Sequence, residues 1–398
     1  MHTSVFPRWA GDSTPPFVLN QCELMATKGW EVTVLAPHSR GAKLSEGIKG
    51  VRVIRYPYML PFQFEQLCYN GGILINLQKK PLLRCLLPFF FLSQLLALLY
   101  VCIREKPTLL HSHSLLPQGL SAAWVGRLLR IPHVTTSHGN DVFGLPTSGW
   151  MGRLKRSVLK QANAITVNSS ATQAAVMALG ASAEKVHLIP AVANVGKIDP
   201  DIVQSIEVKY GKSPKVLFVG RFIEEKGVLD LLQAFAQVKE RVDDVQCLFV
   251  GDGVLRAEMK AMARALKIEQ AVHLIGWRPG EEIASWMAAA DVLIVPSKPV
   301  GTWQEAQGLV VVEAMSVGTP VIASHIGGIP DMVKDGETGR LFTPGDPGQL
   351  AELLVDLFAN HGDYERMTKA ARARVAEHYA ADAVARQTEE LYQRCVKH

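Results

Sequence analysis

The sequence predicts an α/β protein made of two tandem doubly wound, Rossmann-like domains, each built on a parallel sheet. Its 398 residues exceed one ordinary hydrophobic core and suit two domains. Short β-branched runs alternate with longer helical patterns along the whole chain. The runs are continuously apolar rather than alternating, which is typical of strands covered on both faces in a parallel sheet.

The first half contains five predicted strands, and helices between them complete right-handed βαβ units. The expected strands are 31–36, 51–56, 109–111, 133–137 and 164–168. A helix is expected at 17–30, but no apolar strand precedes Thr3, although a doubly wound domain normally opens with one. Either the first strand is a stub or the chain starts upstream, and we prefer the upstream start.

The second half repeats the pattern, with a junction near 195–212 where polar residues, Pro200, Gly211 and Pro214 cluster. The expected strands are 215–219, 246–251, 272–276, 292–296 and 320–323. We therefore assign residues 1–194 to the N-terminal domain and 195–379 to the C-terminal domain.

A run of nineteen uncharged residues, 85–103, interrupts the first domain. Its length approaches a membrane span, but a span inside the domain would break the sheet. The remaining interpretations are a buried helix and a helix partly embedded in a membrane face. In the second case, the basic residues within 79–106 would lie at the lipid headgroups.

Composition excludes several classes of protein. Hydrophobic residues make up 48% and charged residues 20%, which argues against disorder. The six cysteines form no Cys-x-x-Cys pair, and their scatter favours a reducing compartment. The N-terminus does not resemble a signal peptide, so we expect a cytoplasmic protein, with the cytoplasmic face of the membrane as the alternative location.

Charge is distributed unevenly along the chain. Residues 1–200 hold 20 Lys and Arg against 9 Asp and Glu, whereas residues 201–398 hold 22 against 28. A basic half beside an acidic half argues against a general nucleic-acid binder. It suits a protein whose first half faces an anionic surface or substrate.

The most specific motif is the segment 305–315, which reads EAQGLVVVEAM. It follows the predicted strand 292–296 and therefore forms a loop that opens a helix. Gly308 would let backbone N–H groups approach an anion at the helix N-terminus. Glu313 would lie about one turn into the helix, where a carboxylate can accept two sugar hydroxyls. The alternative is an ordinary acidic helix.

A second motif is the segment 219–227, VGRFIEEKG, between a predicted strand and a helix. Gly220 permits a tight turn, and Arg221 and Lys226 can converge on a diphosphate, one as a fork and the other as a point charge. Alone, the segment could equally be a solvated turn. Together with Glu305 and Glu313, it predicts a diphosphate site.

Residues at other strand ends give weaker signals. His138 follows the strand 133–137, where a histidine is usually structural, and Asp141 is more often a cap of the next turn than a catalytic group. The segment 111–113 reads HSH, but histidines on opposite strand faces rarely share a metal, so we expect a structural or acceptor-side role. Gly253 allows either a close ligand or a simple turn. Trp277 and Arg278 follow the strand 272–276 and are candidates for contact with a nucleotide base.

These motifs resemble those of the retaining family 4 glycosyltransferases, which have the GT-B fold. The segment 305–315 is similar to the family's E-x7-E motif, and the GTPVIAS at 318–324 and GGIP at 327–330 continue the likeness, which is strongest over 215–345. Gln307 departs from the family, in which many members have Phe. The resemblance implies two Rossmann-like domains facing across a cleft, with a final helix, 380–398, returning to the first domain.

The resemblance also implies roles for residues. Arg221, Lys226 and Gly220 would bind the pyrophosphate of a nucleotide sugar, and Glu313 its ribose. Three residues that open the helix complete the donor-binding set, namely Gly308, Leu309 and Val310. His138 and Glu305 would be the catalytic pair beside the transferred sugar. Trp277 would contact the base, and the further candidates are Asp141, Gly253 and Arg278.

The predicted function is transfer of a hexose from a nucleotide diphosphate sugar to a glycan or lipid-linked acceptor, with retention of anomeric configuration. No cofactor and no metal are expected, because no Asp-x-Asp follows a strand in the predicted cleft and Arg221 and Lys226 supply positive charge. The expected partners are the donor, the acceptor and a membrane surface contacted through 79–106, without nucleic acid. Three alternatives remain: a nucleotide-sugar 2-epimerase, a glycoside hydrolase and a non-catalytic sugar-nucleotide binding module.

Overall fold

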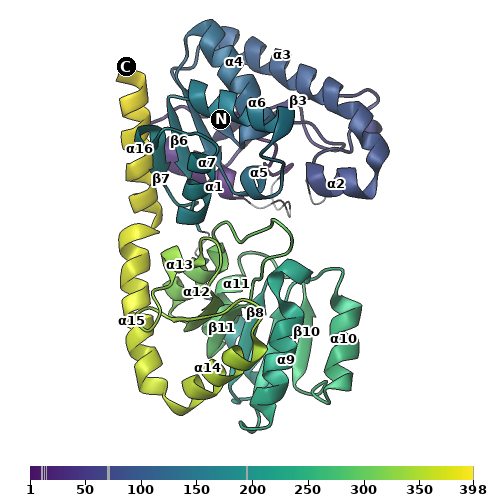
Figure 1. Ribbon diagram of the computed structural model, residues 1–398, viewed down its shortest axis with the longest axis vertical. Coiled ribbons are helices and arrows are strands. Elements are labelled where there is room, and N and C mark those ends of the chain that lie inside the picture. Colours follow the sequence, from purple (N-terminus) through teal and green to yellow (C-terminus); the bar gives the residue numbers. More distant parts are fainter. Residues whose placement is uncertain (10–11, 13, 15, 70–71, 194–195, 398) are drawn as a thin grey trace. The chain divides into compact units, whose positions relative to one another are not determined.

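The computed structural model describes residues 1–9, 12, 14, 16–69, 72–193 and 196–397. It divides the chain into two compact units, and Figure 1 shows that each is a sheet with helices around it. The N-terminal unit comprises Met1–Asn168, Thr172–Val192 and Val384–His398, and the C-terminal unit comprises Ser169–Ala171 and Ala193–Ala383. The domain boundary expected at 194/195 falls outside the described residues.

The sheet of the N-terminal unit consists of two ladders joined by the start of the chain. One ladder has the order β1-β3-β2 and the other the order β4-β5-β6-β7. His2 bridges to Leu35 in β1 and to Ser112 in β4, so the first residues occupy the position of a central strand. The strands are β1 (Thr33–Pro37), β2 (Ser45–Ile48), β3 (Val51–Tyr56), β4 (Leu110–His113), β5 (His133–Ser137), β6 (Ala164–Val167) and β7 (Val186–Leu188).

Helices cover both faces of this sheet. The helices are α1 (Phe17–Thr27), α2 (Ile73–Lys79), α3 (Leu87–Glu105), α4 (Leu120–Leu129), α5 (Asn140–Phe143), α6 (Gly149–Gln161), α7 (Ser170–Ala178) and the end of α16 (Ala381–Lys397). Leu35 packs with residues of α3 and α4, whereas its neighbours Val34 and Ala36 pack with α1. Because successive strand residues point to opposite faces, α1 lies on one face and α3 and α4 lie on the other.

The C-terminal unit has one parallel sheet of six strands in the order β10-β9-β8-β11-β12-β13. This is the doubly wound order, which reverses direction between β8 and β11. The strands are β8 (Lys215–Val219), β9 (Gln246–Val250), β10 (Val272–Gly276), β11 (Val292–Val295), β12 (Val321–Ser324) and β13 (Arg340–Phe342).

Two apolar clusters fill the two faces of this sheet. Val216 and Phe218 of β8 pack with α9, α10 and α14, while Leu217 between them packs with α8, α11 and α12. The helices of the unit are α8 (Pro200–Tyr210), α9 (Val228–Lys239), α10 (Arg256–Ala265), α11 (Ile283–Ala288), α12 (Leu309–Val317), α13 (Ile329–Met332), α14 (Pro347–Ala359) and α15 (His361–His378).

All ten predicted strands are present, and their ends lie within two residues of the expected positions. The sequence did not predict β2, β7 or β13. The bridge at His2 corresponds to the stub of a first strand, which was the less favoured of the two alternatives. One stretch, Pro81–Glu105, is long and apolar enough to cross a membrane by length and composition, with a mean hydropathy of 2.3, and 28% of its most apolar window is buried.

Candidate active site

The predicted diphosphate and sugar residues of the C-terminal unit follow two adjacent strands. Arg221 and Lys226 lie in the segment after β8, and Glu305 lies in the segment after β11. These strands are neighbours at the point where the strand order reverses. Ligands of open α/β sheets bind outside the carboxyl ends of the strands at such a point.

Lys226 and Glu305 form an ion pair in which Lys226 Nζ donates to Glu305 Oε2. The Ser297 hydroxyl donates to the same oxygen at 2.9 Å. Burial would raise the pKa of Glu305, since this residue is only 8% exposed, but the charge of Lys226, the two hydrogen bonds and the charge of Arg221 outweigh burial and lower the pKa below its ordinary value. Glu305 is therefore an ionised carboxylate that is bound by Lys226 and the Ser297 hydroxyl and is also influenced by the charge of Arg221.

Close approach of the two segments depends on glycine. Gly227 has φ +63°, and a Cβ there would lie 1.8 Å from the carbonyl oxygen of Pro296 after β11. Gly327 has φ +57°, and its Cβ would lie 1.8 Å from the carbonyl oxygen of Glu305. Only glycine fits these two backbones so close to their neighbours. The segments that carry Lys226 and Glu305 are thereby fixed.

Helix α12 begins directly after this loop. Gly308 is its N-cap residue, with φ +75°, and Leu309 and Val310 are its first two residues. Glu313 lies one turn further on and is partly buried. The N–H groups at the start of α12 give this helix end a partial positive charge, which suits the approach of an anion.

The end of β10 carries an exposed aromatic side chain. Trp277 is 61% exposed, and Arg278 lies over the ring of Trp286 at 5.8 Å from its centroid. Gly253 follows β9, where a Cβ would lie 2.3 Å from the carbonyl oxygen of Phe222. Glycine is therefore needed at position 253 for packing alone, which favours the interpretation of this residue as part of a simple turn.

His138 lies in the N-terminal unit, immediately after β5. His138 Nε2 and His113 Nδ1 are 3.0 Å apart, and the two rings are stacked at 5.3 Å. The ring of Phe17 contacts His138 edge-on at 4.9 Å. Burial lowers the pKa of His138 to about 4, although the Asp141 carboxylate acts in the opposite direction. His138 is therefore neutral at pH 7.

The proton shared by these histidines has a favoured position. His113 Nε2 is buried and has no hydrogen-bond partner in the described part of the chain. Because a buried N–H without an acceptor is rarer than a buried lone pair without a donor, the geometry favours a proton on His113 Nδ1, donated to His138 Nε2. His138 would then carry its own proton on Nδ1 and could donate it to a ligand.

Asp141 has structural partners on both carboxylate oxygens. The backbone N–H of Leu115 donates to Oδ2 at 2.8 Å, and the Ser137 hydroxyl donates to Oδ1 at 2.8 Å. Asp141 is buried and holds the segments after β4 and β5 together. The role is structural, but it differs from the expected one: Asp141 joins two segments, and the turn α5 that follows β5 has no side-chain cap.

Comparisons with known proteins identify the family of this chain. The family described as glycosyl transferases group 1 matches residues 201–374, and the family described as glycosyltransferase family 4 matches residues 16–195. Phosphatidyl-myo-inositol mannosyltransferase of Mycobacterium leprae is 30% identical over 378 residues, which cover 94% of this chain and 91% of that protein. The chain belongs to the family 4 glycosyltransferases.

Other relatives and solved structures extend the comparison. N-acetyl-alpha-D-glucosaminyl L-malate synthase of Bacillus anthracis is 27% identical to this glycosyltransferase over 73% of the chain and 76% of that protein. Sucrose-phosphate synthase of Thermosynechococcus elongatus superposes with a TM-score of 0.76 at 24% identity, over 99% of this chain and 98% of its own. Anabaena HepE in complex with UDP gives 0.75 at 18% identity, over 98% of each chain. The predicted family and the predicted GT-B fold are both confirmed.

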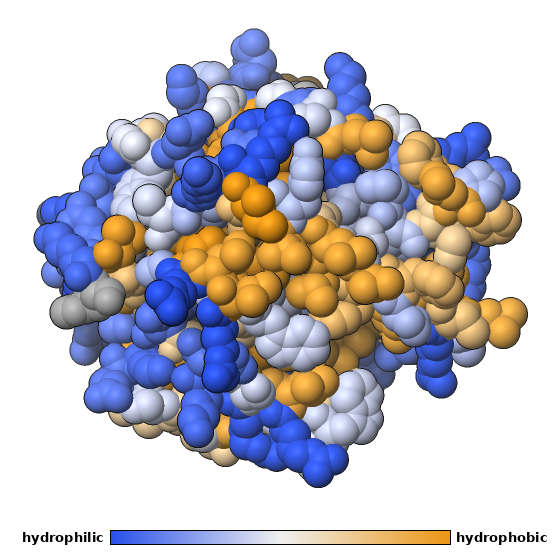
Figure 2. All heavy atoms as spheres, turned by 90° about the horizontal axis from the view of Figure 1, so that it is seen from above, coloured by the Kyte–Doolittle hydropathy of each residue, from blue (hydrophilic) through white to orange (hydrophobic). Residues whose placement is uncertain are grey.

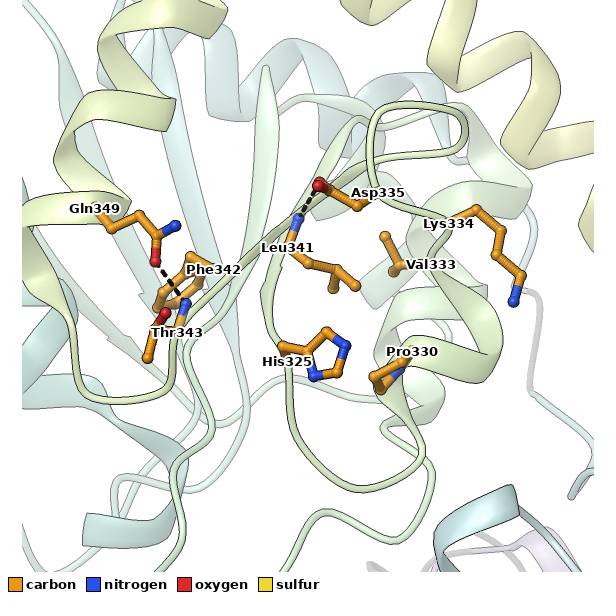
Figure 3. A pocket seen from close by; sticks show the side chains of 9 residues that line it. All are labelled: His325, Pro330, Val333, Lys334, Asp335, Leu341, Phe342, Thr343 and Gln349. Atoms are coloured by element: carbon orange, nitrogen blue, oxygen red, sulfur yellow. Dashed lines mark hydrogen bonds between the residues drawn. The ribbon is translucent and has the colours of Figure 1, made fainter.

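One hollow in the C-terminal unit of the glycosyltransferase lies away from the predicted site. It has a volume of about 560 Å³ and is bordered by β13 and α13, with His325, Pro330 and Phe342 among its lining residues. Figure 3 shows that two polar groups at its wall are already engaged: Leu341 N donates to Asp335 at 2.8 Å, and Thr343 N donates to Gln349 at 2.7 Å. It contains none of the predicted site residues, and we assign it no function.

Three residues of the glycosyltransferase site were not predicted. Ser297 fixes the carboxylate of Glu305, and its position directly after the strand 292–296 was the available signal. Trp303 lies under Lys226, whose Nζ is 5.6 Å from the ring centroid, and no sequence pattern indicated this contact. His113 contacts His138, and the HSH segment indicated only a structural or acceptor-side role, not this contact.

Proposed function

We propose that this glycosyltransferase is a retaining hexosyltransferase that uses a nucleotide diphosphate sugar. The observation that carries the proposal is the position of Arg221, Lys226 and Glu305 at the reversal of strand order in the C-terminal sheet. Two cations beside an ionised carboxylate suit a ligand with an anionic diphosphate on one side and sugar hydroxyls on the other. Retention and the hexose rest on the family resemblance.

The diphosphate would be bound by Arg221, Lys226 and the N-terminus of α12. Its negative charge grows as the glycosidic bond to phosphate breaks, so groups that stabilise this charge lower the barrier. Lys226 would share its charge between Glu305 and a phosphate oxygen. We propose that these groups make a metal ion unnecessary. Among the described residues, no three His, Cys, Asp or Glu side chains are grouped so that they could hold a metal ion.

Activity should therefore survive excess EDTA. A loss of activity in EDTA that is reversed by added Mg²⁺ or Mn²⁺ would contradict this account.

The other donor contacts divide between binding and catalysis. Glu313 would accept the ribose hydroxyls, and Trp277 would stack on the base. Glu305 would orient the transferred sugar through its hydroxyls, and His138 would donate a hydrogen bond to the sugar from the N-terminal unit. Neither would act as a covalent nucleophile. Because uniform binding contacts affect KM and transition-state contacts affect kcat, Glu313→Ala should chiefly raise the donor KM, and His138→Ala should chiefly lower kcat.

The acceptor would be a glycan or lipid-linked glycan at the cytoplasmic face of a membrane. The name of the Mycobacterium leprae relative, a phosphatidyl-myo-inositol mannosyltransferase, supports this for a family member of nearly the same length. The excess of Lys and Arg in residues 1–200 supports an anionic acceptor or surface.

A thermal-shift screen with UDP, GDP and ADP sugars tests the donor class. A donor at a hundredfold excess over its Kd adds about 2.7 kcal/mol of apparent stability. Arg221→Ala should lose the shift, since a charge-assisted hydrogen bond contributes about 1.5–3 kcal/mol. No shift with any donor would overturn the proposed site.

The reaction is then tested with the donor that binds. Transfer to an acceptor with the same anomeric configuration, read by NMR, supports the proposal. Formation of a 2-epimer without acceptor would instead show the epimerase, and binding without turnover would show a binding module.

A further inference from the structure

Helix α3 presents two different faces along its length. One face is buried in the N-terminal unit, with Phe90, Leu98 and Val101 in the apolar cluster around it. The opposite face carries five large apolar side chains that are each between 54% and 60% exposed. They are Phe89, Leu92, Leu96, Tyr100 and Ile103. Their spacing of three or four residues places them in one stripe, which we call the α3 stripe.

Helix α4 widens this stripe into a surface. Trp124 and Leu128 of α4 are 44% and 68% exposed. The ring of Trp124 contacts that of Phe91 in α3 edge-on at 5.6 Å, so the two helices carry one apolar face. Figure 2 shows a continuous band of apolar side chains on this side of the molecule, with hydrophilic side chains around it. An exposed apolar patch with a polar rim marks an interaction site.

The charged residues in the segment that carries this face are almost all basic. Between residues 66 and 140 there are seven Lys and Arg and one acidic residue, Glu105. Glu105 is already paired with Arg52 at 3.0 Å and lies 3.7 Å from Arg104. The seven basic residues are Lys79, Lys80, Arg84, Arg104, Lys106, Arg127 and Arg130. All seven are exposed.

Side-chain hydrogen bonds in the middle of α3 tie the helix to its unit. Gln94 is buried, and its Nε2 donates to the Pro117 carbonyl at 3.1 Å. The Ser93 hydroxyl donates to the carbonyl of Pro57 at 2.5 Å. A helix fixed to the sheet along one side cannot cross a bilayer alone. Its apolar stripe can enter a membrane surface only with the helix axis in the membrane plane.

We propose that the α3 stripe, with Trp124 and Leu128, docks in the plane of an anionic lipid bilayer, and that the surrounding Lys and Arg side chains bind its headgroups. A second copy of this chain is a poorer occupant, because it would bring two basic rims together. This inference concerns a surface that contains none of the proposed donor-site residues, and it does not depend on the donor or the reaction.

The exposed thiol of Cys85, just before α3, offers a local probe. The other five cysteines are buried, so an NBD fluorophore can be attached at Cys85. We expect a blue shift and an increase of NBD emission with vesicles of phosphatidylglycerol and phosphatidylcholine, but not with phosphatidylcholine alone. Binding should be reversed at about 1 M NaCl, where the Debye length falls to about 3 Å.

Substitutions separate the apolar and the charged contributions. Leu92→Gln/Leu96→Gln should lower vesicle partitioning at least about tenfold, because two half-exposed leucines no longer insert. Lys79→Gln/Lys80→Gln/Arg84→Gln should lower it about a hundredfold, since each basic residue contributes about fivefold on an anionic surface. The matched control is Val208→Gln/Val254→Gln, which changes two side chains that are 80% and 83% exposed on the C-terminal unit, and it should leave partitioning unchanged.

Three results would overturn the proposal. The first is no binding to anionic vesicles at low salt. The second is equal, salt-insensitive binding to neutral vesicles. The third is a dimer in sedimentation equilibrium that Leu92→Gln/Leu96→Gln dissociates, because the face would then be covered by a second copy. Unchanged thermal unfolding of each variant shows that the substitutions act on the surface and not on the fold.

Discussion

Replacing Lys226 with methionine removes the cation beside Glu305 and keeps most of the side-chain volume. Glu305 is 8% exposed as a residue, and its partner's side chain is 21% exposed. Loss of one partner of a buried ion pair costs about 3–5 kcal/mol, because the other charge stays buried without compensation. Since Lys226 is partly exposed, we expect the lower end, about 3 kcal/mol of unfolding free energy at pH 7.

The pH dependence has a defined sign. In the wild type the pKa of Glu305 lies below its ordinary value of 4.5, so the pair stabilises the fold above pH 4.5, and this stabilisation is lost as pH falls through the lowered pKa. In Lys226→Met burial remains without the cation, so the pKa should rise above 4.5. The difference in stability between wild type and variant should therefore be large at pH 7 and shrink toward pH 4.

Urea denaturation at several pH values measures the effect. Lys226→Met/Glu305→Gln should recover about 2 kcal/mol relative to the single variant, because no buried charge is left. Lys298→Met is the matched control: Lys298 pairs with Asp230 at 3.0 Å, with side chains 24% and 13% exposed. It should lower stability but keep nucleoside diphosphate affinity, whereas Lys226→Met should weaken that affinity at least about tenfold. A stability of Lys226→Met within about 0.5 kcal/mol of wild type at pH 7, independent of pH, would refute the reasoning.

Three further predictions concern the base, the histidine pair and acid stability. Trp277→Ala should weaken nucleotide binding by about 1–3 kcal/mol in calorimetry, while Trp277→Phe and the equally exposed control Trp150→Ala should change it little. His113→Phe should lower kcat at nearly constant KM, and His113→Asn, whose amide can donate to His138, should restore part of the lost kcat. ¹⁵N NMR should show a proton on His138 Nδ1 in the wild type only. An unchanged kcat in His113→Phe would show that His113 does not position His138. The N-terminal unit should lose stability as the pH falls from 6.5 to 4, because the unfolded chain binds protons that the folded chain does not. The loss should be up to about 1.4 kcal/mol per pH unit for each buried neutral histidine. A urea midpoint that stays constant across this pH range would contradict the prediction. These histidines, whose pKa values burial lowers, are His2, His111, His113, His133 and His138.

The sequence predicted the central strands and the edge strand β10, and it missed the edge strands β2, β7 and β13. β11 is apolar throughout, and β8 is apolar after Lys215, because helices cover both sides, so their composition alone marks them. β2 (Ser45–Ile48) has two exposed residues and two that are partly or fully buried. β7 and β13 have three residues each. Such short edge strands depend on pairing with a neighbour rather than on their own composition, so no local pattern reveals them.

The site was predictable as residue types at strand ends, and not as contacts. Arg221, Lys226 and His138 lie in the segments that follow predicted strands, where a parallel sheet places its binding groups. The hydrogen bond between His113 and His138 depends on the register of β4 and β5, in which His113 lies opposite Thr136. Register is set by packing across the whole unit, so the sequence of either strand alone does not contain it.

The pairing of Lys226 with Glu305 follows from strand order rather than from either motif. The two residues are 79 positions apart, in segments after β8 and β11. If the strands followed the order of the chain, β8 and β11 would be three spacings, about 14 Å, apart, which is too far for direct contact between the segments that leave them. The reversal makes them neighbours at about 4.8 Å. Right-handed crossovers are compatible with either order, so the motifs name the two residues, and only the topology of the sheet brings the ammonium group to the carboxylate.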